Sequence, residues 1–170
     1  MLGLTRKGGV LAATAAMLCV SVPANAAMGC WDQTQVAAAK IRDLQSRLMV
    51  ATLRCSAMGA EISPAYNRFI AANRKTIQSA NTVIMAAFRA GHGPRAGEVQ
   101  YDRFATSLAN IYGDDATDPD ICADTEATAE EAAEAAGDIR ALVALAERTG
   151  GSPTLPGGQC PVSFAEMGGN

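Results

Sequence analysis

The chain has 170 residues, and its 14 Lys and Arg residues against 17 Asp and Glu residues give a formal net charge of −3. This balance argues against binding to nucleic acids or to anionic membrane surfaces, because both need basic patches. Aromatic residues make up only 5% of the chain, and alanine is abundant. That composition favours closely packed helices over a β-sandwich.

Residues 1–26 have the pattern of a secretory signal peptide. Arg6 and Lys7 precede a small and apolar stretch over residues 8–22, and Ala24-Asn25-Ala26 offers small residues at the cleavage positions. The apolar stretch, roughly 15 residues, is shorter than the ~20 that a membrane-spanning helix needs. We therefore predict a periplasmic or secreted protein with no transmembrane segment after cleavage.

A lipid anchor at Cys30 is the alternative for this end of the chain. Cys30 follows Gly29, but Ala27 stands where a lipoprotein signal favours leucine, and lipidation would leave three other cysteines, an odd number. We therefore expect no lipid anchor. The remaining chain divides into a helical domain over residues 27–150 and a Gly- and Pro-rich tail over residues 151–170, tethered through Cys160.

The first helix is predicted from near Trp31 to Ala57, because apolar or small residues recur there in alternating steps of four and three. This spacing gives one continuous apolar face. Its members are Ala37, Ile41, Leu44, Leu48, Ala51 and Cys55. Asp43 and Arg47 lie off this face and are spaced to pair with each other along the helix.

The second helix is predicted to begin with Ser63 as its N-cap and Pro64 as its first residue, and to end at Gly91-His92-Gly93-Pro94. Asn73 is the one polar residue on its apolar face. We interpret Asn73 as setting the helix register or bonding across the bundle, in preference to contacting a ligand.

Two more helices are predicted, one from about Gly97 to Tyr112 and one from Asp124 or Thr125 to Arg148. The last has an alanine-rich face that we expect to be buried: Ala129, Ala132, Ala136, Ile139, Val143 and Ala146. Helices joined by short loops run antiparallel. The expected fold is therefore all-α, an up-down four-helix bundle with an irregular, disulfide-tethered C-terminal tail.

Four cysteines follow the signal region, and an even number in an exported chain indicates two disulfides. Cys30 and Cys55 cannot pair, since a helix rising ~1.5 Å per residue separates them by roughly 38 Å. The bundle topology favours Cys30–Cys160 with Cys55–Cys122. The remaining combination, Cys30–Cys122 with Cys55–Cys160, requires cysteines at opposite ends of the bundle to meet.

No catalytic motif is present, and His92, the only histidine, lies between two helices. The acidic loop over residues 114–124 is the best candidate site, since carboxylates bind calcium. It lacks the spacing of a calcium loop, so its aspartates are weak metal candidates, and we interpret it as a solvated connector before a helix. The aspartates are Asp114, Asp118 and Asp120, with Asp115 and Asp124 beside them.

Three stretches together resemble a family of small exported helical proteins of alphaproteobacteria: residues 44–51 with Cys55, residues 66–69 (Tyr-Asn-Arg-Phe), and residues 101–110, which begin Tyr-Asp-Arg-Phe. The resemblance covers about the first two-thirds of the chain after the signal. It implies export and a helical fold, and it assigns no activity.

Three functions are compatible with these features. The leading hypothesis is a non-enzymatic exported protein that binds a periplasmic or envelope partner and needs no cofactor. The alternative is a small-ligand or metal carrier that uses a cavity between helices or the acidic loop. The third is a hydrolase whose residues meet only in the folded chain.

Overall fold

The computed structural model describes residues 29–114 and 117–161. The expected signal peptide (residues 1–26), Asp115, and the end of the tail after residue 161 lie outside the described residues.

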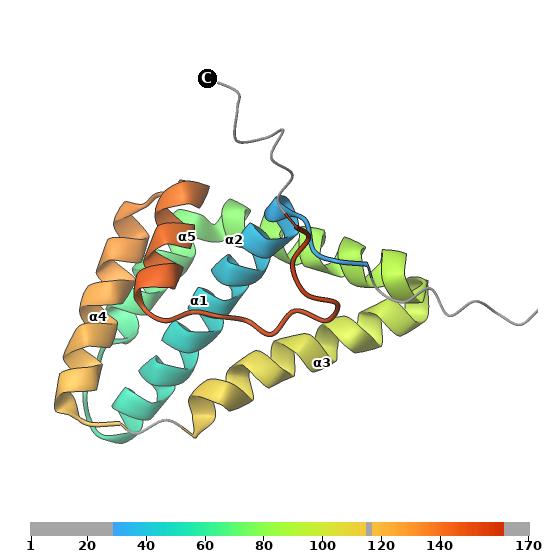
Figure 1. The fold of residues 1–170 in the computed structure, drawn as a ribbon. Coiled ribbons are helices and arrows are strands. Elements are labelled where there is room, and N and C mark those ends of the chain that lie inside the picture. The colour runs from blue at the N-terminus through green and yellow to red at the C-terminus, as the bar shows by residue number, and fades with distance from the viewer. Residues whose placement is uncertain (1–28, 115–116, 162–170) are drawn as a thin grey trace, which may run out of the picture.

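Within those limits the protein is all-helical, as the sequence predicts. It has five helices where four were expected (Figure 1). They are α1 (Gln33–Ala57), α2 (Ser63–His92), α3 (Pro94–Gly113), α4 (Pro119–Glu134) and α5 (Ile139–Arg148).

Proline and side-chain caps set where the helices begin. Asp32 caps α1 by accepting a hydrogen bond from the Gln35 backbone, and the Gln35 side chain accepts one in return from Asp32 N. Trp31 therefore lies outside α1. Ser63 is the first residue of α2 and not its N-cap, and α3 begins at Pro94, three residues earlier than expected.

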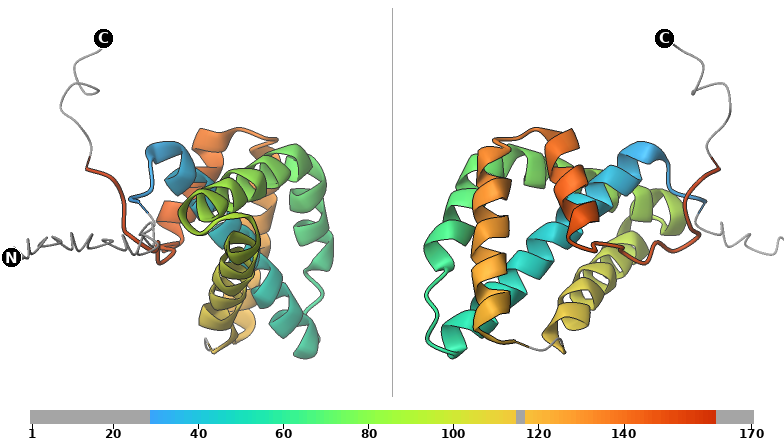
Figure 2. Two further views of the ribbon diagram at one scale, coloured as in Figure 1. Left: turned by 90° about the vertical axis from the view of Figure 1, so that its right-hand side faces the viewer. Right: turned by 60° about the vertical axis from the view of Figure 1, so that its left-hand side comes forward.

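The predicted fourth helix is wrong in two respects. It starts early, at Pro119, because the Asp118 side chain accepts a hydrogen bond from Ile121 N and caps α4. It also breaks after Glu134: Gly137 has a φ of 92°, and Asp138 caps a new helix. The expected bundle is therefore incorrect in this half of the chain, where α5 folds back beside α4 (Figure 2).

Asn73 stabilises this break. Its Nδ2 donates to Ala132 O at the end of α4 (2.7 Å), and its Oδ1 accepts from Gly137 N (2.7 Å). The interpretation of Asn73 as a hydrogen bond across the bundle is thus confirmed. Because the helix stops here, Ala136 and Ile139 are exposed, although the alanine-rich face was expected to be buried.

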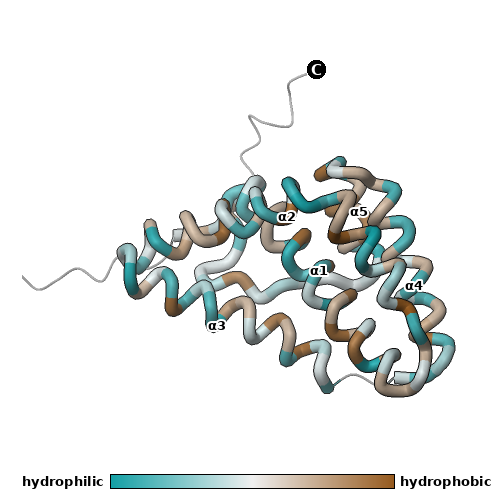
Figure 3. Tube along the Cα trace, turned by 180° about the vertical axis from the view of Figure 1, so that it is seen from behind, coloured by the Kyte–Doolittle hydropathy of each residue, from teal (hydrophilic) through white to brown (hydrophobic). Residues whose placement is uncertain are grey.

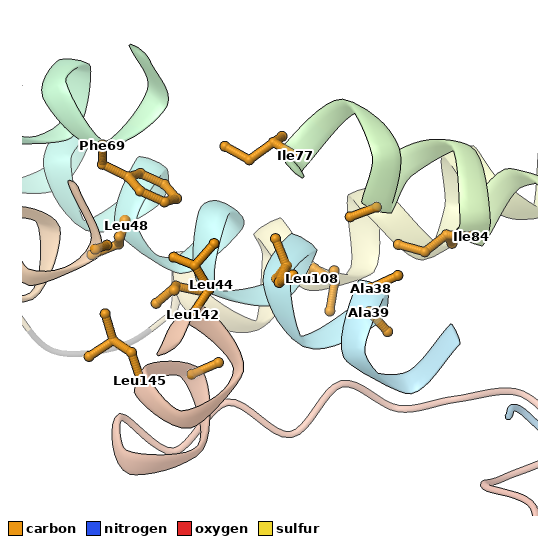
Figure 4. Packing of buried hydrophobic residues seen from close by; sticks show 14 of the residues in the cluster. Ala38, Ala39, Leu44, Leu48, Phe69, Ile77, Ile84, Leu108, Leu142 and Leu145 are labelled. Carbon is orange, nitrogen blue, oxygen red and sulfur yellow. The ribbon is translucent and has the colours of Figure 1, made fainter. Parts of the chain in front are cut away.

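α1 lies at the centre of the molecule and contacts each of the other four helices. Leu44 and Leu48 of α1 point toward Phe69 of α2 and toward Leu142 and Leu145 of α5 (Figure 4). All five side chains are buried. Because other helices cover α1 on more than one face, some of its polar residues are buried as well.

The two disulfides are Cys30–Cys160 and Cys55–Cys122, with Cα–Cα distances of 4.8 Å and 5.7 Å. These are the pairs that the bundle topology favours. We call them the tail disulfide and the buried disulfide, since Cys55 and Cys122 are 0% and 2% exposed. The sulfur of Cys30 is bonded to that of Cys160.

The described part of the tail, residues 149–161, contains no helix and crosses the molecule from the end of α5 to the start of α1 (Figure 1). Trp31 fixes it there: Trp31 N donates to Gly158 O, Cys160 N donates to Trp31 O, and the indole Nε1 donates to Pro156 O at 2.9 Å. Trp31 also packs against the rings of Phe88 and Phe104. The tail thus closes over an aromatic cluster.

Hydrophilic and hydrophobic residues alternate along the helices (Figure 3). None of the helices in the described ranges has the length and apolar character required to cross a membrane.

Candidate functional site

A pocket of about 330 Å³ lies between α1, the C-terminal end of α3 and the start of α4. This volume is at the small end of the range for ligand-binding pockets. The described residues that line it are Arg47, Ala51, Arg54, Tyr112, Thr117, Ile121 and Thr125. Two are arginines, two carry an aliphatic hydroxyl, and none is a carboxylate.

α1 supplies both arginines. Arg54 Nη1 donates to Tyr112 O (2.8 Å) and Gly113 O (3.0 Å), the last carbonyls of α3. A cation at this position stabilises the negative end of the helix dipole. Arg47 lies two turns earlier on α1 and is half-buried; it makes no hydrogen bond or ion pair with the residues that the structure describes.

α4 supplies the opposite wall of the pocket. Ile121 and Thr125 are one turn apart on α4, so they share a face, and Thr117 lies just before the helix. The Thr117 and Thr125 hydroxyls make no hydrogen bond to the described part of the chain. Ala51, between the two arginines, is small enough to leave the space between these walls open.

Asp43 lies behind the pocket and is only 1% exposed. Its Oδ1 accepts a hydrogen bond from the Tyr112 hydroxyl (2.7 Å), whereas its buried Oδ2 has no hydrogen-bond partner among the described atoms. Burial raises the pKa of Asp43, and the Tyr112 hydrogen bond and the charge of Arg47 partly oppose this rise. Asp43 is thus a buried titratable group that interacts with Arg47 and Tyr112.

The chain approaches Asp43 most closely at Gly151. A Cβ atom at Gly151 would lie 2.8 Å from Asp43 Oδ2 and 2.8 Å from Ala146 O. Any larger residue would therefore collide with the backbone of α5 and with this carboxyl group. No sequence pattern indicated this close approach.

Three of the described aspartates of the acidic loop lie at the ends of two different helices. Asp118 caps α4, Asp120 lies in the first turn of α4, and Asp114 caps the C-terminal end of α3, all three exposed. No three metal-binding side chains lie together within residues 29–114 and 117–161. Asp124 is exposed on α4, and Asp115 lies outside the described residues. The described aspartates therefore match the interpretation of a connector before a helix.

His92 and the exposed glutamates of α4 are other side chains capable of acid–base chemistry. His92 is exposed at the end of α2 and stacks on Phe88, with ring centroids 6.4 Å apart. Glu130 and Glu134 border a shallow groove, but both lie on α4, one turn apart, and Glu130 pairs with Arg68 at 2.7 Å. Two carboxylates on one helix face do not oppose each other across a substrate, as glycoside cleavage requires.

A second concavity of about 460 Å³ lies between α1, α2 and the start of α5. Alanine, valine and isoleucine side chains form most of its wall, and Ile139, 52% exposed, lies at its edge. It brings together fewer charged groups than the pocket at Arg47 and Arg54. We therefore take the arginine-lined pocket as the candidate site.

Comparison with known proteins adds no assignment: no family model, no curated protein and no solved structure matches this chain. The resemblance to exported alphaproteobacterial proteins stays a prediction.

Proposed function

We propose that this protein is an exported, non-enzymatic binding protein that holds a small ligand in the pocket between α1, α3 and α4. The observation that supports the proposal most is that Arg47, Arg54 and two threonines line one half-open pocket. Specific small-molecule sites combine an enclosed volume with a few well-placed polar groups in this way. Export itself rests on the signal pattern of residues 1–26.

The lining side chains favour binding over catalysis. Guanidinium groups donate hydrogen bonds and stay protonated near neutral pH, so they do not act as general bases. The Tyr112 hydroxyl already donates to Asp43, which orients it away from a role as a nucleophile. The site is thus equipped to hold and orient a ligand.

The large exposed hydrophobic residues give less support to a protein partner. They are spread over α1 and its C-cap, α3 and α5: Leu53, Met58, Val99, Ile111 and Ile139. A docking surface is expected to gather such residues in one patch. Binding of an envelope partner, the leading expectation from the sequence, therefore ranks second.

A pocket-filling variant tests the proposal. The oxidised protein, expressed with its own signal sequence, is screened by thermal unfolding against a panel of small acids, amines, sugars and amino acids. A ligand that binds the folded state raises the melting temperature. We expect at least one class to do so, and Ala51→Leu, which fills the pocket, to abolish the rise.

Ala144→Leu, on the exposed face of α5, is the matched control and should retain the rise. The proposal is wrong if no compound raises the melting temperature, or if the rise persists in Ala51→Leu.

A further inference from the structure

We propose that the ligand of this pocket is a small dicarboxylate, with one carboxylate group paired to Arg47 and the other to Arg54. The inference rests on the proposed function and names the chemical class that the same site selects. It follows from the sign of the charge in the pocket, the spacing of the two arginines, and the donors that remain available on each.

The charge of the lining residues selects an anion. Both ionisable side chains on the α1 wall are cationic, and a described carboxyl group close to them, that of Asp43 behind the pocket, interacts with Arg47. Guanidinium groups bind carboxylates through two parallel hydrogen bonds, which gives orientation as well as attraction. A cationic ligand would be repelled by the two guanidinium groups, and an uncharged ligand would form weaker hydrogen bonds with them than a carboxylate forms.

The spacing of the cations selects an anion with two acidic groups. Arg47 and Arg54 are seven residues apart on one helix, about 10 Å along its axis, and Ala51 lies on the same face between them. A monocarboxylate forms its two parallel hydrogen bonds with one guanidinium at a time. A short chain with a carboxylate at each end can contact both while its middle packs over the alanine.

Enough donors remain for this contact. Arg54 commits Nη1 to the two carbonyls at the end of α3, which leaves the N–H groups of Nη2 and Nε. Arg47 has no hydrogen bond or ion pair with the described residues. The Thr117 and Thr125 hydroxyls can donate from the α4 wall to the same ligand oxygens.

Calorimetric titration of the oxidised protein with succinate tests the inference, with acetate, inorganic phosphate and the diamine putrescine as comparisons. We expect succinate to bind about tenfold or more tightly than acetate or phosphate, since it contacts two cations, and putrescine not to bind. Raising the salt concentration should weaken succinate binding.

Arg47→Gln should weaken succinate binding about tenfold or more, because it removes one charge-assisted contact. Arg103→Gln, on an exposed position of α3, removes the same charge outside the pocket and should leave the affinity unchanged. Arg47→Lys keeps the charge without the planar fork and should give an intermediate affinity. Arg54 is left intact because it also holds the end of α3.

The inference is overturned if acetate or phosphate binds as tightly as succinate, or if Arg47→Gln and Arg103→Gln have equal effects. If the Ala51-dependent ligands are amines or sugars, the ligand class is wrong while the binding function holds. If no compound of any charge binds in an Ala51-dependent manner, the binding function itself fails.

Discussion

Asp43→Asn is expected to stabilise the protein at pH 8. The ionised carboxylate of Asp43 is buried, and its Oδ2 has no hydrogen-bond partner among the described residues. An unsatisfied buried polar group costs about 1–3 kcal/mol, and a charged one costs more. Asparagine keeps an oxygen for the Tyr112 hydroxyl and puts an uncharged N–H₂ group in place of the unpartnered Oδ2. We expect a gain of about 1–3 kcal/mol in unfolding free energy.

The gain depends on pH with a definite sign. Burial raises the pKa of Asp43 above its ordinary value, so the folded state holds the proton more tightly than the unfolded state. The penalty from this group is complete above the folded-state pKa and falls as pH decreases. It vanishes below the ordinary aspartate pKa of about 3.9. The advantage of Asp43→Asn should therefore be large at pH 8 and small at pH 4.

Urea unfolding at pH 4 and pH 8, followed by Trp31 fluorescence, measures this difference. Asp102→Asn, an exposed carboxylate on α3, is the control and should show no comparable pH dependence. If Asp43→Asn destabilises the protein more at pH 8 than at pH 4, our reasoning is wrong. The ionised carboxylate of Asp43 would then stabilise the fold, because its attraction to Arg47 would exceed the cost of burying it.

Three further changes test other parts of the structure. Asn73→Ala should destabilise the protein by about 2–4 kcal/mol, because it leaves buried backbone groups at the α4–α5 break unpaired. Asn67→Ala, at an exposed position, should not destabilise it. Equal urea midpoints for the two variants would contradict this expectation. Ser46→Ala should be neutral or stabilising, because the buried Ser46 Oγ has no partner in the described structure; a loss above about 1 kcal/mol would reveal a missed contact. The tail disulfide should be reduced before the buried disulfide under a mild reductant, because Cys30 is exposed. Alkylation followed by mass spectrometry measures the order of reduction. The reverse order would contradict the burial of Cys55 and Cys122.

Sequence periodicity predicted the existence of the helices and the pairing of the cysteines well. Both depend on regularities that are local or that follow from helix length. The alternation of four and three residues marks the first helix, and the length of that helix alone excludes a Cys30–Cys55 bond. The pairing survived the error in the fourth helix because Cys122 still lies near Cys55 at the end of α1.

Periodicity did not predict which polar residues are buried, because burial depends on how many other helices pack against a helix. The heptad pattern identifies one apolar face of α1, yet α1 is covered by four other helices. Asp43 and Ser46 lie off that face and are buried all the same. The break at Gly137-Asp138 was missed because the alanine-rich pattern continues through it.

The candidate pocket could not be predicted because its walls come from three helices and its floor is a small residue. Arg47 and Arg54 were identifiable as neighbours on one helix, but their burial depends on α3 and α4, which pack beside them only in the fold. The acidic loop attracted attention because its charges are close in sequence. In the structure its described aspartates serve helix ends.

Binding of a small dicarboxylate at the arginine-lined pocket is tested most directly by two-dimensional NMR of the ¹⁵N-labelled oxidised protein during titration with succinate. We expect saturable shift changes concentrated at Arg47, Ala51, Arg54 and Thr125, with the groove beside Ile139 unchanged. The account is contradicted if the spectrum does not change, or if the changes concentrate at the Ile139 groove.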